Sequence, residues 1–122
     1  MARILIIDDD AAVRRTMRMI VERSGHVVGE AEDGAMGLSL FRQGAYDLVI
    51  TDLLMPEKEG IETIMELREE APGVKILAVS GGMFLDRRGP LEDAEALGAD
   101  SSLPKPFSVE EFRAAVEGLL RG

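Results

Sequence analysis

Residues 4–10 read ILIIDDD, an apolar run that ends directly in three carboxylates. Four consecutive apolar residues, three of them β-branched isoleucines, are typical of a strand that is buried on both faces. Such strands belong mainly to parallel sheets with helices on both sides. The sequence therefore predicts a parallel α/β domain in which Asp8 and Asp9 stand at the carboxyl end of the first strand.

The rest of the chain alternates in the same way between strand-length apolar runs and segments with helical spacing. We expect strands at residues 4–7, 26–29, 48–51, 74–79 and 101–103. We expect helices around residues 13–21, 33–44, 61–65, 91–97 and 108–119. The last helix opens with Ser108 and Glu111, which have the spacing of a capping box. Strict alternation in so short a chain predicts one parallel sheet with helices on both faces.

The composition is that of one globular domain and argues against several classes of function. The chain has 122 residues, of which 46% are hydrophobic and 30% charged, and it contains no cysteine. A thiol nucleophile, a disulfide and a thiolate metal site are therefore excluded. The net charge of −9 repels nucleic-acid phosphates, so we expect no direct binding to nucleic acid. The first apolar run is too short for a signal peptide or a membrane span, so we expect a cytoplasmic protein without membrane insertion.

Polar residues follow several of the expected strands at the point where each strand ends. Asp8 and Asp9 follow the first strand, Asp52 the third and Ser80 the fourth, and Lys105 comes shortly after the fifth. Ligand crevices of open α/β sheets lie at the carboxyl ends of the strands. We therefore expect these five residues to converge on one edge of the sheet.

Such a constellation suits phosphoryl transfer to a carboxylate. Clustered carboxylates repel one another unless a cation compensates them, and Mg²⁺ prefers oxygen ligands. An aspartate can accept a phosphoryl group covalently. A metal ion, a lysine and a hydroxyl group can then neutralise the phosphoryl oxygens, which is most of what this reaction requires.

Four motifs carry a resemblance to a known family: ILIIDDD at 4–10, DLVITDLLMPEKEG at 47–60, ILAVSG at 76–81 and LPKPF at 103–107. In this order and spacing the chain resembles the receiver domains of two-component response regulators, especially the single-domain, chemotaxis-type members. The resemblance covers residues 1–122 as one receiver domain. It implies a flavodoxin-like, doubly wound (βα)5 fold whose five-stranded parallel sheet has the order 2-1-3-4-5.

The resemblance also implies roles for the metal-binding residues. Asp52 corresponds to the phosphoacceptor and contributes to the Mg²⁺ site. Asp9 corresponds to the direct Mg²⁺ ligand, and Asp8 to the acid that acts through water. The backbone carbonyl of Leu54 would supply a further ligand.

The remaining implied roles concern the switch. Ser80 corresponds to the switch hydroxyl and Lys105 to the lysine that pairs with the phosphoryl group, with a cis bond between Lys105 and Pro106. Ser102 occupies the place where the family often has an aromatic switch residue. We therefore expect the loop of residues 80–90 to change most on phosphorylation.

The function implied is two-component signal transduction. A sensor histidine kinase or a phosphotransfer protein would donate the phosphoryl group to Asp52, and the face around Ser80 and Lys105 would then bind a downstream target protein. The domain would be no enzyme in the usual sense, because it catalyses only its own phosphorylation and dephosphorylation. We expect a monomer or a weak dimer linked to phosphorylation.

Three rival functions remain, each with a discriminating feature. A haloacid-dehalogenase-type phosphatase needs a second aspartate two residues after the nucleophile, where Leu54 stands. A flavodoxin needs a phosphate loop rich in Ser, Thr and Gly after the first strand, where DDDAAVRR would repel phosphate. An interaction module without phosphorylation is disfavoured because every acidic, hydroxyl and lysine position is filled. Of the other polar residues, we expect Asp10 to be a helix cap or a surface residue and His26 to be structural or exposed.

Overall fold

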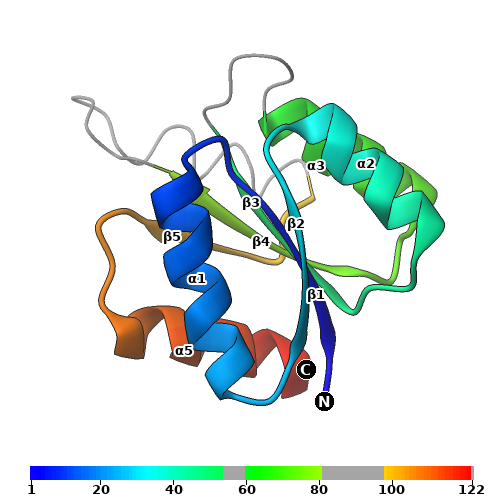
Figure 1. The fold of residues 1–122 in the computed structure, drawn as a ribbon. Coiled ribbons are helices and arrows are strands. Elements are labelled where there is room, and N and C mark those ends of the chain that lie inside the picture. Colours follow the sequence, from blue (N-terminus) through cyan, green and yellow to red (C-terminus); the bar gives the residue numbers. More distant parts are fainter. Residues whose placement is uncertain (54–59, 81–97, 122) are drawn as a thin grey trace.

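A single parallel sheet forms the centre of the molecule (Figure 1). The computed structural model describes residues 1–53, 60–80 and 98–121 of the chain. Its strands are β1 (Arg3–Ile7), β2 (Val27–Ala31), β3 (Leu48–Asp52), β4 (Lys75–Ser80) and β5 (Ser101–Pro104). They lie in the order β2-β1-β3-β4-β5, with every neighbouring pair parallel. The predicted fold class and strand order are confirmed.

Helices cover both faces of this sheet. The described helices are α1 (Ala11–Arg23), α2 (Gly34–Gln43), α3 (Gly60–Glu70) and α5 (Val109–Arg121). α1 and α5 lie on one face, and α2 and α3 on the other (Figure 1). The helix expected around residues 91–97 and residues 81–90 of the loop expected at 80–90 lie outside the described residues. No helix in the described part of the chain is both long and apolar enough to span a membrane.

The side chains of β1 alternate between the two halves of the core. Ile4 and Ile6 pack on the side of α1 and α5, in one cluster with Phe112. Leu5 and Ile7 pack on the side of α2 and α3. All five side chains are fully buried. Because a shift of one residue would exchange the two faces of the strand, this packing holds the position of the acids that follow β1.

The strand boundary that differs most from the prediction is the end of β2. β2 continues through Glu30 to Ala31, two residues beyond the expected end at Gly29. Its pairing with β1 continues through the same residues, with Glu30 opposite Ile6 and Ala31 opposite Ile7. Glu30 is polar, but β2 is an edge strand, where a charged side chain is tolerated.

The predicted helix caps are present. An Asp10 Oδ1 oxygen accepts the backbone N–H groups of Ala12 (2.9 Å) and Val13 (3.2 Å), which makes Asp10 the N-cap of α1. At α5, Ser108 Oγ accepts the N–H of Glu111 at 3.0 Å, and a Glu111 carboxylate oxygen accepts the N–H of Ser108 at 2.8 Å. This reciprocal pair is the expected capping box.

His26 is structural, as expected, and lies far along the sheet from the clustered acids. Its Nδ1 accepts the backbone N–H of Ala2 at 3.0 Å. Nε2 therefore carries the proton and donates to the Glu117 carboxylate, 2.9 Å away. The imidazole ties the start of β1 to α5.

Gly60 packs directly against the end of β3. A Cβ atom added to Gly60 would lie 2.2 Å from the backbone oxygen of Asp52 and 2.5 Å from Leu53 Cα. Both neighbours are backbone atoms, which cannot move aside as a flexible side chain would. A side chain at residue 60 would therefore push α3 away from Asp52.

We expect Gly60→Ala to destabilise the protein by about 1–3 kcal/mol, the usual cost of overpacking a rigid contact. Gly118→Ala is the matched control, because a Cβ on Gly118 meets no atom within 4 Å. Alanine in the interior of α5 should stabilise the protein by about 1 kcal/mol. Urea unfolding measures both changes. Equal effects of the two variants would contradict the close approach of Gly60 to β3.

Candidate functional site

Three aspartates meet at the carboxyl edge of the sheet. Asp8 and Asp9 follow β1 directly, and Asp52 is the last residue of β3. One carboxylate oxygen from each lies within 4.8 Å of the others. Asp8 and Asp52 are buried, whereas Asp9 is exposed. The cluster therefore has two acids in the protein interior and one that faces solvent.

Lys105 reaches this cluster from the segment after β5. Its Nζ lies 2.9 Å from Asp8 Oδ2 and 3.5 Å from Asp52 Oδ2. The Lys105–Pro106 bond is cis, as the resemblance implied. The ammonium group thus bridges the ends of two strands that carry buried carboxylates.

The charge of Lys105 is stabilised by these neighbours. Burial of the ammonium group by itself lowers the pKa of Lys105. The hydrogen bond to Asp8 and the negative charge of Asp52 outweigh that effect, so the pKa of Lys105 is raised above its ordinary value. Lys105 is therefore a cation at neutral pH.

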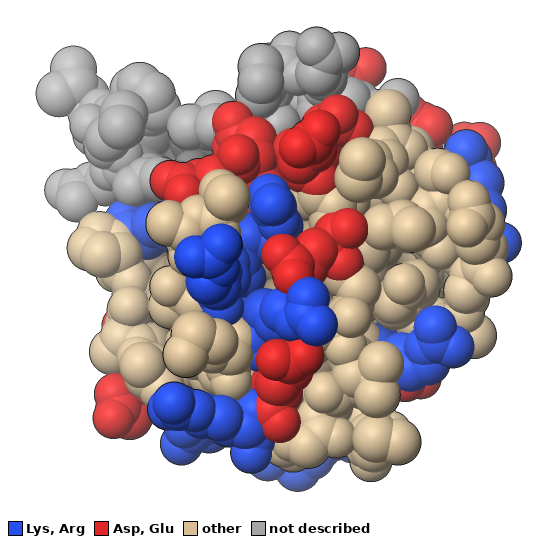
Figure 2. Space-filling view, in the orientation of Figure 1, with Lys and Arg blue, Asp and Glu red and all other residues tan. Residues whose placement is uncertain are grey.

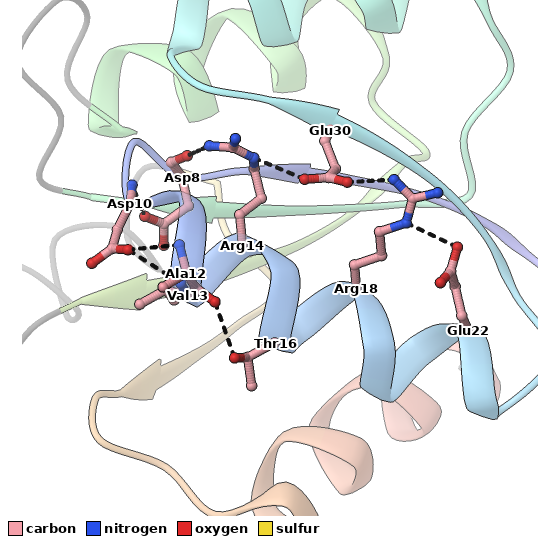
Figure 3. Close-up of polar contacts among 9 residues, drawn as sticks. All are labelled: Asp8, Asp10, Ala12, Val13, Arg14, Thr16, Arg18, Glu22 and Glu30. Carbon is pink, nitrogen blue, oxygen red and sulfur yellow. Dashed lines mark hydrogen bonds and ion pairs between the residues drawn. The ribbon is translucent and has the colours of Figure 1, made fainter.

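Asp8 is held in place at both its side chain and its main chain. Its Oδ1 accepts the N–H of Asp10 at 2.9 Å, while Oδ2 faces Lys105. Its own N–H donates to the carbonyl of Ala31 at 3.1 Å. Its carbonyl oxygen accepts a hydrogen bond from Arg14 Nη1 at 2.7 Å (Figure 3).

Arg14 begins a chain of ion pairs along α1 and β2 (Figure 3). Arg14 Nε pairs with Glu30 at 2.9 Å, and the other Glu30 oxygen pairs with Arg18. Arg18 Nε also pairs with Glu22 at 2.9 Å. Figure 2 shows the resulting interleaving of basic and acidic side chains on this face of the molecule. We call these four residues the Arg14–Glu22 network.

The sequence reasoning missed this network. Arg14 and Glu30 are 16 residues apart and meet only because β2 lies beside β1. A signal did exist for Arg14. It lies one helical turn after the N-cap Asp10, and a helix that opens immediately after a strand brings that turn back over the strand end.

Two expected site residues are described only in part or not at all. Ser80 ends β4 at the same edge of the sheet, where it pairs with Pro104 of β5. Leu54 lies outside the described residues. The structure therefore brings together Asp8, Asp9, Asp52 and Lys105 from the predicted set.

The acid cluster fits a small divalent cation. Mg²⁺ takes oxygen ligands at about 2.1 Å and usually keeps several of its bound waters. One oxygen of each aspartate lies within 4.8 Å of the others, so these carboxylates could reach one such ion directly or through its waters. The cluster contains only oxygen donors, which suits Mg²⁺ better than softer metals.

The fold and site define a class of protein, a doubly wound α/β domain with an acidic cluster and a lysine at the carboxyl edge of its sheet. The family model described as "Response regulator receiver domain" matches residues 4–117. The chain therefore belongs to the family of response regulator receiver domains, which act in two-component signalling. The predicted resemblance is confirmed.

Relatives with known names support this assignment. The response regulator MprA of Mycobacterium sp. (strain KMS) is 38% identical over 119 residues, which are 98% of this chain and 50% of that protein. The transcriptional regulatory protein ResD of Bacillus subtilis (strain 168) is 36% identical over 119 residues, which are 98% of this chain and 48% of that protein. The chain thus spans about half the length of these relatives.

Solved structures show the same fold. A CheY-like response regulator receiver domain from Methanospirillum hungatei superposes with a TM-score of 0.87 at 28% identity, covering 99% of this chain and 94% of that one. A receiver domain from Clostridium thermocellum gives a TM-score of 0.89 at 27% identity, covering 99% and 95%. The flavodoxin-like architecture therefore extends over the whole described chain.

The partly buried Glu30 predicts a pH dependence of stability. The hydrogen bond from Arg18, more than that from Arg14, lowers the pKa of Glu30 below its ordinary value of 4.5. A carboxyl group with a lowered pKa stabilises the fold fully above its unfolded pKa, and this contribution is lost as the pH falls through the folded value. Glu30→Gln should therefore cost about 1–2 kcal/mol at neutral pH and almost nothing at a pH well below 4.5.

Urea unfolding of wild type and Glu30→Gln at the two pH values measures this difference. Glu69→Gln is the control, because Glu69 is an exposed glutamate on α3. It should follow the wild-type pH profile. If Glu30→Gln lowers the free energy of unfolding as much in acid as at neutral pH, the ionised carboxylate is not what stabilises the fold.

Proposed function

We propose that this receiver domain accepts a phosphoryl group on Asp52 in a Mg²⁺-dependent reaction. The observation that carries the proposal is the charge balance at the sheet edge. Three clustered carboxylates face one ammonium group, so these four side chains leave two negative charges. One divalent cation balances that charge. The Arg14–Glu22 network does not, because its two arginines are matched by two glutamates.

The four side chains have separate roles in this proposal. Asp9, which is exposed, and the buried Asp8 and Asp52 would hold the cation, which when bound neutralises the oxygens of the incoming phosphoryl group. Asp52 is the nucleophile: its carboxylate oxygen bonds to phosphorus as the phosphorus–nitrogen bond of a phosphohistidine donor breaks. The electron pair stays on the imidazole nitrogen, which takes up a proton from water. Lys105 pairs with the phosphoryl oxygens.

We assign the remaining expected residues on the family resemblance. The Leu54 carbonyl completes the metal site, and the Ser80 hydroxyl donates to the phosphoryl group as the switch. Ser80 ends β4 and Lys105 follows the neighbouring strand β5, so both residues stand at one edge of the sheet. The surface at this edge would bind the downstream target once the phosphoryl group is in place.

The proposed partners follow from the class. The donor is a sensor histidine kinase or a phosphotransfer protein, and the output is a protein surface. ResD is named as a transcriptional regulatory protein, but the net charge of −9 argues against direct DNA binding by this domain. We propose that residues 1–122 act as one cytoplasmic receiver domain, monomeric or weakly dimeric on phosphorylation, with no reaction beyond its own phosphorylation and dephosphorylation.

Phosphorylation should occur on Asp52. Incubation with acetyl phosphate and Mg²⁺ should add the mass of one phosphoryl group to the intact protein, and Asp52→Asn should abolish the adduct. Asp47→Asn is the matched control, because Asp47 lies just before the opposite end of β3 and accepts the N–H of Arg3. An adduct that survives in Asp52→Asn, or that maps to another residue of the wild type, would refute the assignment.

Mg²⁺ should raise the thermal midpoint of the wild type. A ligand that binds only the folded state stabilises it by about 2.7 kcal/mol at a hundredfold excess over its dissociation constant. Asp9→Asn should reduce this response. Asp10→Asn should keep it, since asparagine caps a helix as well as aspartate does. A midpoint that Mg²⁺ leaves unchanged in the wild type would contradict the metal site.

A further inference from the structure

The peptide group between Asp8 and Asp9 is held by contacts on its amino-terminal side. The N–H of Asp8 donates to Ala31 of the neighbouring strand, and the Asp8 carbonyl accepts from Arg14 at 2.7 Å. Because a peptide group is planar, the direction of the Asp8 carbonyl also sets the position of the Asp9 nitrogen and Cα. Arg14 therefore acts on the backbone from which the Asp9 side chain projects.

Asp9 depends on this backbone more than Asp8 does. The Asp8 carboxylate is held by the N–H of Asp10 and by Lys105. In the part of the chain that the structure describes, no hydrogen bond or ion pair holds the exposed Asp9 carboxylate. Its direction toward the cluster is therefore set by its main chain.

Arg14 is itself held firmly. Its side chain is 17% exposed and pairs with Glu30, whose side chain is 26% exposed. The outer members of the network, Arg18 and Glu22, are 42% and 43% exposed. Glu30 receives hydrogen bonds from both arginines, so its two oxygens orient both guanidinium groups. A partly buried arginine whose Nε and Nη1 bind two different acceptors is a more rigid donor than an isolated surface charge.

The charge of Arg14 does not explain its place beside a cation site. A single positive charge there would repel a divalent cation. The glutamates of the network cancel the charges of both arginines, so little net field remains at the acid cluster. The effect of Arg14 on the site therefore comes from its hydrogen bond to the Asp8 carbonyl, which fixes the position of the backbone.

We propose that Arg14 is a positioning residue that orients the Asp8–Asp9 peptide so that Asp9 presents its carboxylate to the cation. The proposal rests on the proposed Mg²⁺-dependent function of the site. It adds a residue on α1 that contacts neither the cation nor the phosphoryl group. Hydrogen-bonding partners behind metal ligands typically change metal affinity 10- to 100-fold when they are removed.

Metal affinity tests this directly. Isothermal titration of the full chain with Mg²⁺, at fixed pH and salt, should give Arg14→Ala a dissociation constant about 10- to 100-fold above that of the wild type. Arg18→Ala is the matched control: it removes the other arginine bound to Glu30, but Arg18 makes no contact with Asp8 in the described structure. Its Mg²⁺ affinity should stay within about threefold of the wild type, well under that range.

Two further variants separate positioning from general stability. Arg14→Lys can donate to the Asp8 carbonyl but cannot also bind Glu30 with a second nitrogen, so it should restore part of the affinity. Glu30→Gln keeps the size of the side chain but removes its charge, and should fall between wild type and Arg14→Ala. Phosphorylation by acetyl phosphate should be slow in Arg14→Ala at low Mg²⁺ and should recover at saturating Mg²⁺.

The outcomes are distinct. A wild type that binds no Mg²⁺ overturns the proposed function itself. A wild type that binds Mg²⁺ while Arg14→Ala binds it equally well overturns the positioning role alone. Equal losses in Arg14→Ala and Arg18→Ala also overturn it, because they would show an effect of the network's charge or stability. If Arg14→Ala does not fold, Arg14→Met decides, because methionine fills part of the same space without a hydrogen-bond donor: an Arg14→Met variant that binds Mg²⁺ as tightly as Arg18→Ala overturns the proposal.

Discussion

The ammonium group of Lys105 is the contact on which the rest of the site depends. It joins Asp8, 97 residues earlier in the chain, to Asp52, and both of these carboxylates are buried. A buried carboxylate without a partner costs several kcal/mol, and the ammonium group of Lys105 compensates both members of this pair. The segment after β5 is thereby tied to the ends of β1 and β3. The contacts of Lys105 therefore both form the site and fix the segment after β5 at the edge of the sheet.

The parallel topology makes this contact possible. All five strands point the same way, so residues that follow β1, β3 and β5 meet at one edge although they are distant in sequence. Close packing behind the edge then limits movement. Gly60 of α3 lies against the backbone oxygen of Asp52, and the fully buried side chains of β1 hold the strand that leads to Asp8. Rigid supports of this kind keep reacting groups in place without a large site.

The sequence predicted the parts that follow from periodicity and strand ends. The ILIIDDD run and the alternation after it led to the sheet, and the carboxyl-end rule indicated that Asp8, Asp9, Asp52 and Lys105 would meet. Contacts that depend on the direction of side chains could not be predicted from the sequence. Arg14 on α1 pairs with Glu30 on β2, and no spacing in one sequence encodes that contact. The approach of Gly60 to β3 likewise depends on how closely α3 packs.

Two kinds of charge arrangement therefore lie side by side at the end of β1. The Arg14–Glu22 network is balanced, whereas the aspartate cluster with Lys105 lacks two positive charges. A balanced network can shape the neighbouring backbone without competing for the ligand. The aspartate cluster, which is not balanced, can bind a cation, and its contacts with Lys105 can change when the charge on Asp52 changes. Lys105 lies closer to Asp8 than to Asp52, at 2.9 Å against 3.5 Å. Phosphorylation would replace the single negative charge of Asp52 with nearly two on the phosphoryl oxygens and would draw the ammonium group away from Asp8. The same lysine that stabilises the resting pair would then report the modification to the segment after β5.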